Sequence, residues 1–422
     1  MSLERSPDGL VFPRARNYKN VSGAVVQSWR GGGRWFTQQW KVTHLENSTL
    51  IFDPSTGMQG GEGMTSSGQW WIENVLEECD AEREWFFDEA KRLLYWNPNG
   101  TAALTGFEKW TATKARVLFD VSGTSEKPVV GLTLRGLRFI DARHTYLDPH
   151  GMPSGGDWAL QRNGALTLEG TVGMTISNCA FERVDGVALS ANGFHRGLVI
   201  SGNDFSWIGD TSATVLKDNV HFNGPRAGVN FNDGFAGGDL IQGNLLANCV
   251  RESGDHGPIN SWDRMPYIFD HGAGATVQPE FRQIRRNFIF AVYSSQEAID
   301  NDDGSSYYNA TSNFFAYGQH GLKSDYGGHH NLHSGNVYAW VQDAYLQGVS
   351  DAFEGNVVIA NSFDEGFASD CELAPKMTVS GNLIYTKSGN LSTKICDKSN
   401  IVVGKWPPAS KVAEMAREVL FD

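Results

Sequence analysis

Carboxylates recur at a fixed distance before a short apolar segment in the second half of the chain. Asp302 lies 11 residues before Asn313, and Asp325 lies 11 residues before Asn336. In a chain built from repeated units, equal offsets place side chains at the same position of successive units. Similar counts along the neighbouring segments extend the set. The predicted row consists of Asn192, Asp233, Asp255, Asp302 and Asp325.

A row of carboxylates on adjacent strands has a definite chemistry. Neighbouring strands are about 4.8 Å apart, so unpaired carboxylates repel each other and their pKa values separate. Two carboxylates about 5 Å apart suit retaining hydrolysis of a glycosidic bond, and roughly 6.5–9.5 Å suits inversion. We therefore predict an acid/base and a nucleophile among Asp255, Asp302 and Asp325, with Asp303 as a fourth catalytic candidate. The predicted substrate-binding and supporting residues are Asn192, Arg226, Asp233, His256, Trp262, Lys323 and His329.

Other interpretations of the same residues stay open. A polysaccharide lyase would use Lys323 as its base. It would hold Ca²⁺ on Asp302, Asp303 and Asp325 to neutralise a uronate carboxylate. Basic side chains are few among these acids, which favours hydrolysis over elimination, and no other cofactor is predicted. Asp and Asn also fill tight corners of β-folds without any function, but GDHG, DNDDG and KSDYGGHH in consecutive repeats favour a functional site.

These residues belong to a repeat that begins near residue 130. Each copy is a short apolar alternation, a small or polar corner and a second short strand, as in GLVISGNDFSWI and KMTVSGNLIYT. Several copies are 20–26 residues apart, which predicts a parallel β-helix with one coil per repeat; a sandwich or propeller is the alternative. Asn tolerates the left-handed backbone of a corner, and its amide can bond to the same Asn one coil away. The expected ladder comprises Asn203, Asn244, Asn287, Asn313, Asn336, Asn356 and Asn382.

Composition fits one all-β body better than the three domains that 422 residues would suggest. The chain has 48 Gly and 12% aromatic residues but only 20% charged residues, which is typical of short strands with tight corners. A net charge of −13 disfavours nucleic acid and anionic membranes as partners, and no 18-residue apolar run predicts a membrane span. No CxxC motif predicts a zinc site; Cys371 and Cys396 are candidates for a disulfide, and the other three cysteines are expected to be buried thiols.

The two ends of the chain differ from the repeat. We expect residues 1–128 to form the first coils plus an inserted or capping β-layer, in which WFFDEAKRLLYW makes two strands around a turn. Residues 129–405 are the predicted β-helix body, and 406–422 a C-terminal helix with Ser410 as its N-cap. That helix is expected to cover the open end of the solenoid. Its predicted apolar stripe is Val412, Met415, Ala416, Val419 and Leu420.

Several segments together resemble a known group of proteins. They are WWIENVLEECDAEREWFFDEAKRLLYW, PSGGDWALQRNGALTLEG, NGPRAGVNFNDGF, RESGDHGPINSWDRMPY, DNDDGSSYYN and GLKSDYGGHH. They resemble right-handed parallel β-helix proteins of the pectin-lyase-like superfamily, near its fucosidase and xylanase group of glycoside hydrolases. The resemblance implies action on a complex polysaccharide and a secreted or cell-surface location, although MSLERSPDGL shows no signal peptide. The alternative is a non-catalytic β-helix that assembles with itself or binds glycans.

Overall fold

The structure is a computed structural model that describes most of the chain. The chain divides into two compact units, residues 1–114 with 144–161, and residues 115–143 with 162–422. The described residues are 5–6, 9–29, 34–35, 37–56, 69–98, 110–148, 150, 161–211, 217–232, 237–262, 268–269, 277–278, 280–290, 297–324, 327–346, 348–360, 368–369, 377–391 and 401–421.

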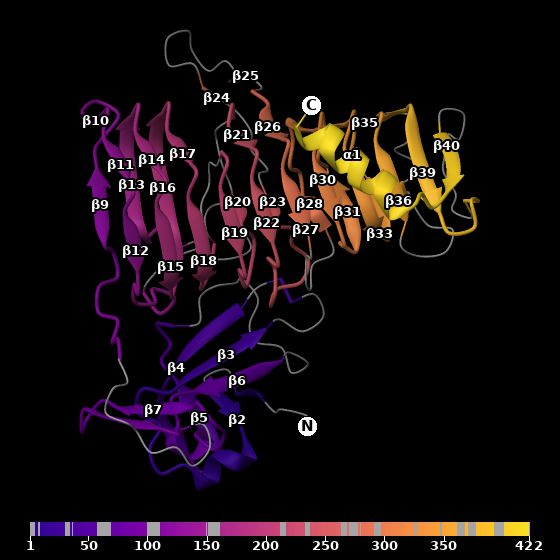
Figure 1. Ribbon diagram of the computed structural model, residues 1–422. Coiled ribbons are helices and arrows are strands. Elements are labelled where there is room, and N and C mark those ends of the chain that lie inside the picture. Colours follow the sequence, from indigo (N-terminus) through magenta and orange to yellow (C-terminus); the bar gives the residue numbers. More distant parts are fainter. Residues whose placement is uncertain are drawn as a thin grey trace. The chain divides into compact units, whose positions relative to one another are not determined.

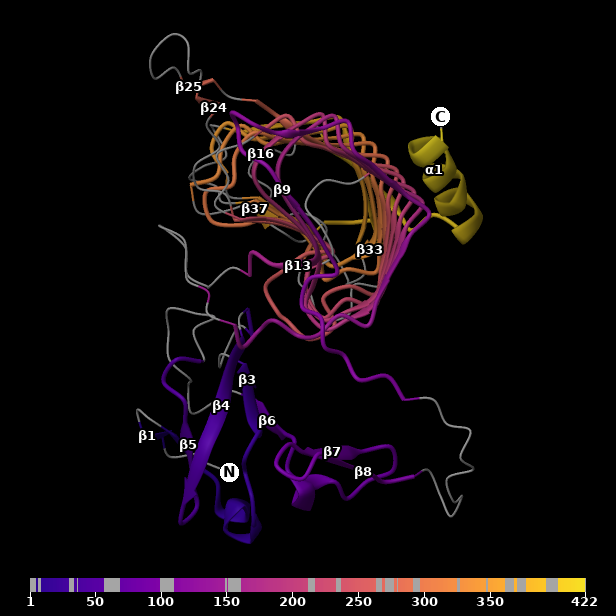
Figure 2. The ribbon, with the colours of Figure 1, turned by 90° about the vertical axis from the view of Figure 1, so that its left-hand side faces the viewer.

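The larger unit is a parallel β-helix with three faces, which confirms the predicted fold (Figures 1 and 2). In a complete coil, such as the one formed by β11, β12 and β13, the chain passes through a strand of face 1, then face 2, then face 3, and each strand pairs in parallel with its counterpart in the next coil. Face 1 contains β11 (Thr133–Arg135), β14 (Thr175–Ser177), β17 (Val199–Ser201), β21 (Leu240–Gln242), β26 (Arg282–Arg285), β29 (Tyr308–Thr311), β32 (Leu332–Ser334), β35 (Ala352–Glu354) and β38 (Thr378–Ser380).

Faces 2 and 3 complete each coil. Face 2 is one continuous sheet of β12 (Arg138–Ile140), β15 (Ala180–Val184), β18 (Asp204–Ile208), β19 (Val220–Phe222), β22 (Leu245–Ala247), β27 (Phe288–Phe290), β30 (Phe314–Ala316), β33 (Val337–Val341), β36 (Val357–Ala360), β39 (Asn382–Thr386) and β40 (Ile401–Lys405). Face 3 has a first sheet of β9 (Phe119–Ser122), β10 (Val129–Val130), β13 (Gly164–Val172) and β16 (Val187–Arg196). Its second sheet has β20 (Val229–Asn232), β23 (Ile259–Trp262), β28 (Glu297–Asn301), β31 (His320–Ser324), β34 (Asp343–Leu346) and β37 (Ala368–Ser369).

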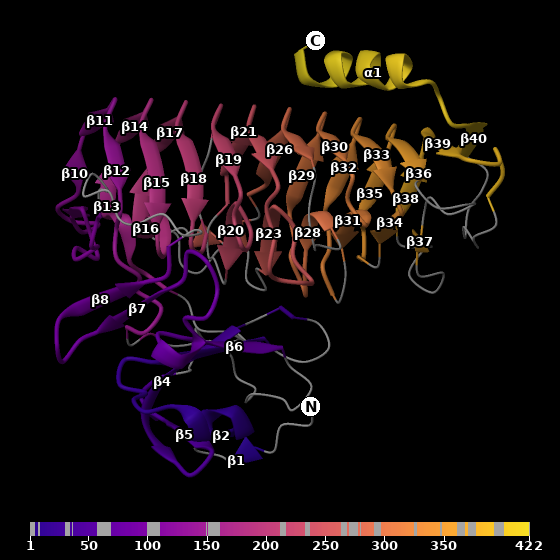
Figure 3. The ribbon, with the colours of Figure 1, turned by 60° about the horizontal axis from the view of Figure 1, so that its bottom comes forward.

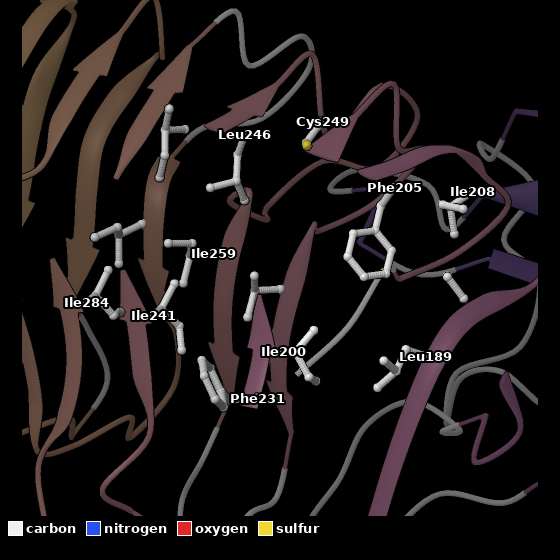
Figure 4. Close-up of a cluster of buried hydrophobic side chains, with 14 of the residues drawn as sticks. Leu189, Ile200, Phe205, Ile208, Phe231, Ile241, Leu246, Cys249, Ile259 and Ile284 are labelled. Atoms are coloured by element: carbon white, nitrogen blue, oxygen red, sulfur yellow. The ribbon is translucent and has the colours of Figure 1, made fainter. Parts of the chain in front are cut away.

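Alternation along these short strands builds the core. Successive side chains of a strand point to opposite sides, so one apolar position per strand faces the interior of the coil. Figure 4 shows such residues from several coils, among them Ile200, Phe205, Ile241 and Leu246, gathered between the faces. Because each coil lies directly on the one before it, identical positions stack into continuous apolar columns. The β-helix therefore has a single core that runs along its axis.

The predicted asparagine ladder is confirmed at the corner between faces 1 and 2. From Asn203 to Asn382, each Nδ2 donates to Oδ1 of the Asn one coil on, over 2.8–3.2 Å. Asn219 also belongs to the ladder, and the sequence did not reveal it because the interval of 41 residues from Asn203 to Asn244 conceals an extra coil. The expectation that the ladder Asn itself adopts the left-handed backbone of the corner was wrong. The left-handed residue is the one before the Asn, such as Gly202 or Ser312.

Helix α1 (Ala409–Phe421) forms as predicted but lies elsewhere than expected. Its apolar stripe packs on the outer surface of face 2 over β30 and β33, so it does not cover the end of the solenoid (Figures 2 and 3). The reason lies in face 2, whose strands carry apolar residues at outward as well as inward positions; Phe314 and Val337 are outward and buried beneath the helix. Ser410 is inside the first turn and is therefore not the N-cap.

The smaller unit is an antiparallel sheet with its own core around Leu10, Val26 and Leu50. Its six strands run in the order β1 (Arg5–Ser6), β2 (Gly9–Val11), β5 (Thr49–Phe52), β4 (Thr37–Glu46), β3 (Val25–Trp29) and β6 (Trp70–Glu73). The predicted hairpin is confirmed as β7 (Trp85–Asp88) paired with β8 (Leu93–Trp96). Parallel pairing begins at β9, inside residues 1–128 where the first coils were expected, whereas the strand pairs described within residues 1–114 are antiparallel.

Short elements and the cysteines complete the description. Two 3₁₀ turns, η1 (Pro13–Asn17) and η2 (Leu76–Glu78), and an antiparallel pair, β24 (Ile268–Phe269) with β25 (Val277–Gln278), stand beside the main sheets. Cys179 and Cys249 are buried free thiols as predicted, whereas Cys79 is half-buried. Cys371 and Cys396 lie outside the described residues. Among the helices that the structure describes, none is long and apolar enough to cross a membrane.

One core column contains a histidine that carries a testable prediction. The rings of Phe139, Phe181, Phe205 and His221 stack at 4.7–4.8 Å, and neither nitrogen of the fully buried His221 has a hydrogen-bond partner in the described part of the chain. Burial lowers the pKa of His221 to about 3. His221→Phe should therefore raise the free energy of unfolding at pH 7 by about 1–3 kcal/mol, because a buried polar group without a partner is removed.

The same substitution should change the response to acid. Below pH 6.5 the unfolded chain protonates His221 while the folded chain does not until about pH 3, so wild-type stability falls by about 1.4 kcal/mol per pH unit from this residue alone. Urea unfolding at pH 7 and pH 5 measures both effects. A variant that is less stable at pH 7, or that keeps the full wild-type acid dependence, would contradict this assignment.

Candidate active site

Three aspartates converge on one lysine on the outer side of face 3. Lys323 lies in β31 between the inward Leu322 and Ser324, so its side chain points away from the core, and only 8% of it is exposed. Its Nζ lies 2.9 Å from Asp302 Oδ1, 3.1 Å from Asp255 Oδ1 and 3.5 Å from Asp300 Oδ1. The ammonium group is thus the centre of a charged cluster drawn from three coils.

Local backbone structure positions these aspartates. Asp300 is an outward residue of β28, in register between Asn260 of β23 and Lys323 of β31. Asp302 follows the end of β28, where its N–H donates to Ser261 O at 2.9 Å. Asp255 lies in the turn before β23 with a left-handed φ of 57°, a conformation that Asp tolerates better than most residues. A strand, a strand end and a turn therefore each contribute one carboxylate.

The three carboxylates differ in exposure and in protonation. The side chain of Asp255 is 32% exposed and that of Asp302 is 14% exposed, whereas Asp300 is fully buried. Burial raises the pKa of Asp302, the Lys323 ammonium opposes that rise, and the charges of Asp255 and Asp303 add to it. Burial also raises the pKa of Asp300 well above its usual value. Two carboxylates are accessible, and one of these binds its proton more tightly than a free aspartate does.

His256 and Arg226 form a buried pair next to this cluster. His256 Nε2 lies 3.1 Å from Arg226 Nη2, and the imidazole is 1% exposed. Burial, followed by the charges of Arg226 and Lys323, lowers the pKa of His256 well below its ordinary value. The imidazole is therefore neutral, and Nε2 accepts from the guanidinium. This pair lies next to the turn that carries Asp255, and its imidazole has no imidazolium proton to give to a substrate near neutral pH.

The structure brings together only part of the predicted row. Asp255 and Asp302 meet at Lys323, but they do not share a column, because Asp255 lies in a turn and the register pairs Asn260 with Asp300. Asn192 is in β16, in the other sheet of face 3, where its Nδ2 donates to Arg162 O at 2.8 Å. A single column was therefore the wrong expectation: equal offsets hold only for coils of equal length. Asp233 and Asp325 lie outside the described residues.

The predicted neighbours also differ in their access to solvent. Trp262, one of the predicted substrate-binding and supporting residues, is only 1% exposed, so its side chain is packed away from solvent. His329 is half-buried, with Nδ1 at 2.9 Å from His330 Nδ1 and its ring edge-on to Tyr307 at 5.3 Å. Asp303 is partly exposed beside Asp302. Asp303 and Tyr307 lie between β28 and β29, and His329 lies one coil later, between β31 and β32. Trp262, by contrast, is packed into the protein.

Asp300 is the residue that sequence reasoning missed. It is an outward residue of β28 that lies between Ile299 and Asn301, which are buried and face inward. A signal was present in the alternation of EAIDN, where Glu297 and Asp300 are charged residues inside a strand that is otherwise apolar or small. The offset of 11 residues before Asn313 falls on Asp302 at the strand end, and Asp300 lies two residues earlier, so the offset did not identify it.

The cation at the centre of the cluster is a side chain of the protein, the Lys323 ammonium group. Within the described residues, no group of three or more His, Cys, Asp or Glu side chains is arranged to hold a metal ion. The positive charge among the three carboxylates is instead the Lys323 ammonium. The calcium interpretation relied on Asp302, Asp303 and Asp325, and Asp325 is outside the described residues, so that interpretation stays a prediction.

Comparisons with known proteins give one distant likeness. No family model matches the chain, and no curated protein matches it. A solved chain described as "Glycoside hydrolase" superposes with a TM-score of 0.46 at 13% sequence identity, covering 78% of this chain and 69% of that chain. The β-helix is thus similar in outline to a protein of that description, and at this TM-score the likeness carries no argument about activity.

Proposed function

We propose that the chain hydrolyses glycosidic bonds of a complex polysaccharide at the Lys323 cluster. The observation that carries the proposal is the meeting of two partly exposed carboxylates, Asp255 and Asp302, on one buried ammonium group. A pair of carboxylates in different environments is the recurring requirement of glycoside hydrolysis, since one must carry a proton while the other is ionised. The raised pKa of Asp302 and the greater exposure of Asp255 supply that difference.

The geometry favours retention of configuration. Because both contacting oxygens lie about 3 Å from the same nitrogen, they are within about 6 Å of each other, close to the carboxylate separation of retaining enzymes. In this scheme Asp302 gives its proton to the glycosidic oxygen as the bond to the anomeric carbon breaks, and an Asp255 oxygen bonds to that carbon. Asp302 then takes a proton from water, which displaces Asp255 and leaves a new hydroxyl on the sugar.

The contacts of Lys323 disfavour the lyase interpretation. Hydrogen bonds to Asp255 and Asp302 keep the ammonium charged, whereas a base must be neutral to remove a proton. The structural interpretation, in which the β-helix assembles with itself, predicts that the site is covered. The partial exposure of Asp255 and Asp302 supports access for a substrate instead.

A screen of neutral and acidic polysaccharides tests the proposal. Each reaction is scored for new reducing ends and for absorbance of the unsaturated uronate that a lyase leaves. We expect reducing ends without that absorbance on at least one substrate. Both signals together would replace hydrolysis by elimination. Neither signal on the whole panel, with intact folded protein, would favour the structural or glycan-binding interpretation, which binding measurements on the same panel would then separate.

A further inference from the structure

We propose that Asp300 is a carboxylic acid in the folded protein and that its hydroxyl donates a hydrogen bond to Oδ1 of Asn260. Asp300 would then be a positioning residue beneath the proposed catalytic pair, which it supports without touching substrate. The inference deepens the proposed function in that it concerns the same site. Its tests need no substrate, so that its failure and the failure of hydrolysis are distinguishable.

The register of face 3 places the two groups side by side. Asn230, Asn260, Asp300 and Lys323 pair in sequence across β20, β23, β28 and β31. Asn260 Nδ2 donates to Asn230 Oδ1 at 2.8 Å, which turns its own Oδ1 toward the following coil, where Asp300 lies. One N–H of the Asn260 amide is thus donated to Asn230, and its Oδ1 remains as an acceptor for Asp300.

Between Asn260 and Asp300, buried oxygen acceptors face each other without a hydrogen-bond donor. Asp300 is 0% exposed and Asn260 is 1% exposed. Over the part of the chain that is described, neither oxygen of Asp300 nor Oδ1 of Asn260 has a hydrogen-bond partner. Acceptors buried without a donor are costly, and an ionised carboxylate in that condition is costlier still. A single proton on Asp300 satisfies one of its own oxygens and Asn260 Oδ1 at once.

The charges around Asp300 favour the same assignment. Lys323 hydrogen-bonds to Asp302 and Asp255 at 2.9 and 3.1 Å, while Asp300 Oδ1 stands off at 3.5 Å. The charged groups that act on Asp300 are Lys323 from β31, Asp302 and Glu297 from its own coil, and Asp255 from the turn before β23. One cation among three other acids leaves no compensation for a further buried negative charge. Burial and these acids raise the pKa of Asp300, in agreement.

A neutral Asp300 has a consequence for the proposed catalytic pair. With Asp300 protonated, the positive charge of Lys323 is shared by Asp255 and Asp302 alone. That arrangement holds both carboxylates on the ammonium from two directions. An ionised Asp300 would compete with Asp255 and Asp302 for the positive charge of Lys323. It would therefore weaken the two ion pairs that hold the proposed catalytic carboxylates in place.

Infrared difference spectroscopy of carboxyl-labelled protein tests the protonation directly. In the difference spectrum of wild type minus Asp300→Asn at pH 7, we expect the band of a protonated carboxyl group that the variant lacks. Asp218→Asn is the matched control, since Asp218 is an exposed residue of the corner between faces 1 and 2 and should lose a carboxylate band. Loss of a carboxylate band from Asp300→Asn would overturn the proposal and imply that the Asn260 amide is turned the other way.

Proton linkage supplies a second test. Because Asp300 holds its proton in the folded state above the ordinary aspartate pKa, its own contribution to wild-type stability should fall as pH rises. From pH 5 to 7 the ratio of the folding constants of wild type and Asp300→Asn should drop about tenfold per pH unit. The variant should fold, because its amide N–H can donate to Asn260 Oδ1. A ratio that does not depend on pH would overturn the proposal. If Asp300→Asn does not fold, Asn260→Ala should shift the protonated band, and an unchanged band would contradict the hydrogen bond.

Discussion

Asp302→Asn is expected to lower the rate of polysaccharide hydrolysis by about two to four orders of magnitude, the usual contribution of a general acid. The amide keeps the size of the side chain but has no acidic proton for the glycosidic oxygen. Lys323 keeps its contact with Asp255, so the fold of the site should persist. The initial rate of release of reducing ends, on whichever polysaccharide the screen identifies, measures the effect.

Its control is Asp218→Asn, which makes the same chemical change at an exposed corner away from face 3 and should leave the rate unchanged. The pH profile gives an independent check. Since burial raises the pKa of Asp302, the wild-type rate should fall on the alkaline side as the acid loses its proton, and the variant should lack that limb. Full activity of Asp302→Asn would remove this residue from the chemistry and transfer the role of acid to another group.

The sequence predicted the parts of this molecule that depend on local periodicity. Short apolar alternations and Asn corners at recurring intervals were sufficient to predict a parallel β-helix and most of its ladder, because each coil repeats the same local pattern. The stripe of α1 was also predictable, but its location was not. The clue lay in FFA at 314–316, where all three positions are apolar, since a strand buried on both sides needs a cover outside the coil.

The candidate site was harder to predict because it depends on register. Offsets brought Asp255 and Asp302 into one set, yet they reach Lys323 from a turn and a strand end. Coil lengths vary through insertions and left-handed turns, and a change of one residue moves a side chain to the opposite side of a strand. Asp300 therefore escaped notice, although it has the same partner. Pairing between coils, which no single segment encodes, decides which residues meet.

Arg282 offers the largest expected effect on stability. It lies in β26 with Ile284, on the side that faces the core, and its side chain is 3% exposed. Nε pairs with Asp239 Oδ2 at 2.9 Å, and Nη1 donates to Tyr308 Oη at 3.0 Å. The guanidinium carbon lies 5.1 Å from the centre of the Phe231 ring and 5.2 Å from that of Tyr308. A charged group is thus held inside the coil by an ion pair and two aromatic faces.

Arg282→Ala should lower the free energy of unfolding by about 3–5 kcal/mol, because it leaves Asp239 with an uncompensated charge and opens a cavity between two rings. Urea unfolding of the full chain measures it. Replacing both partners, as Arg282→Met with Asp239→Asn, removes the charges together and should cost much less, since a buried pair contributes little net stability over apolar packing. If the double variant is as unstable as Arg282→Ala, the aromatic and hydrogen-bonding contacts of the guanidinium, and not its charge, stabilise this part of the core.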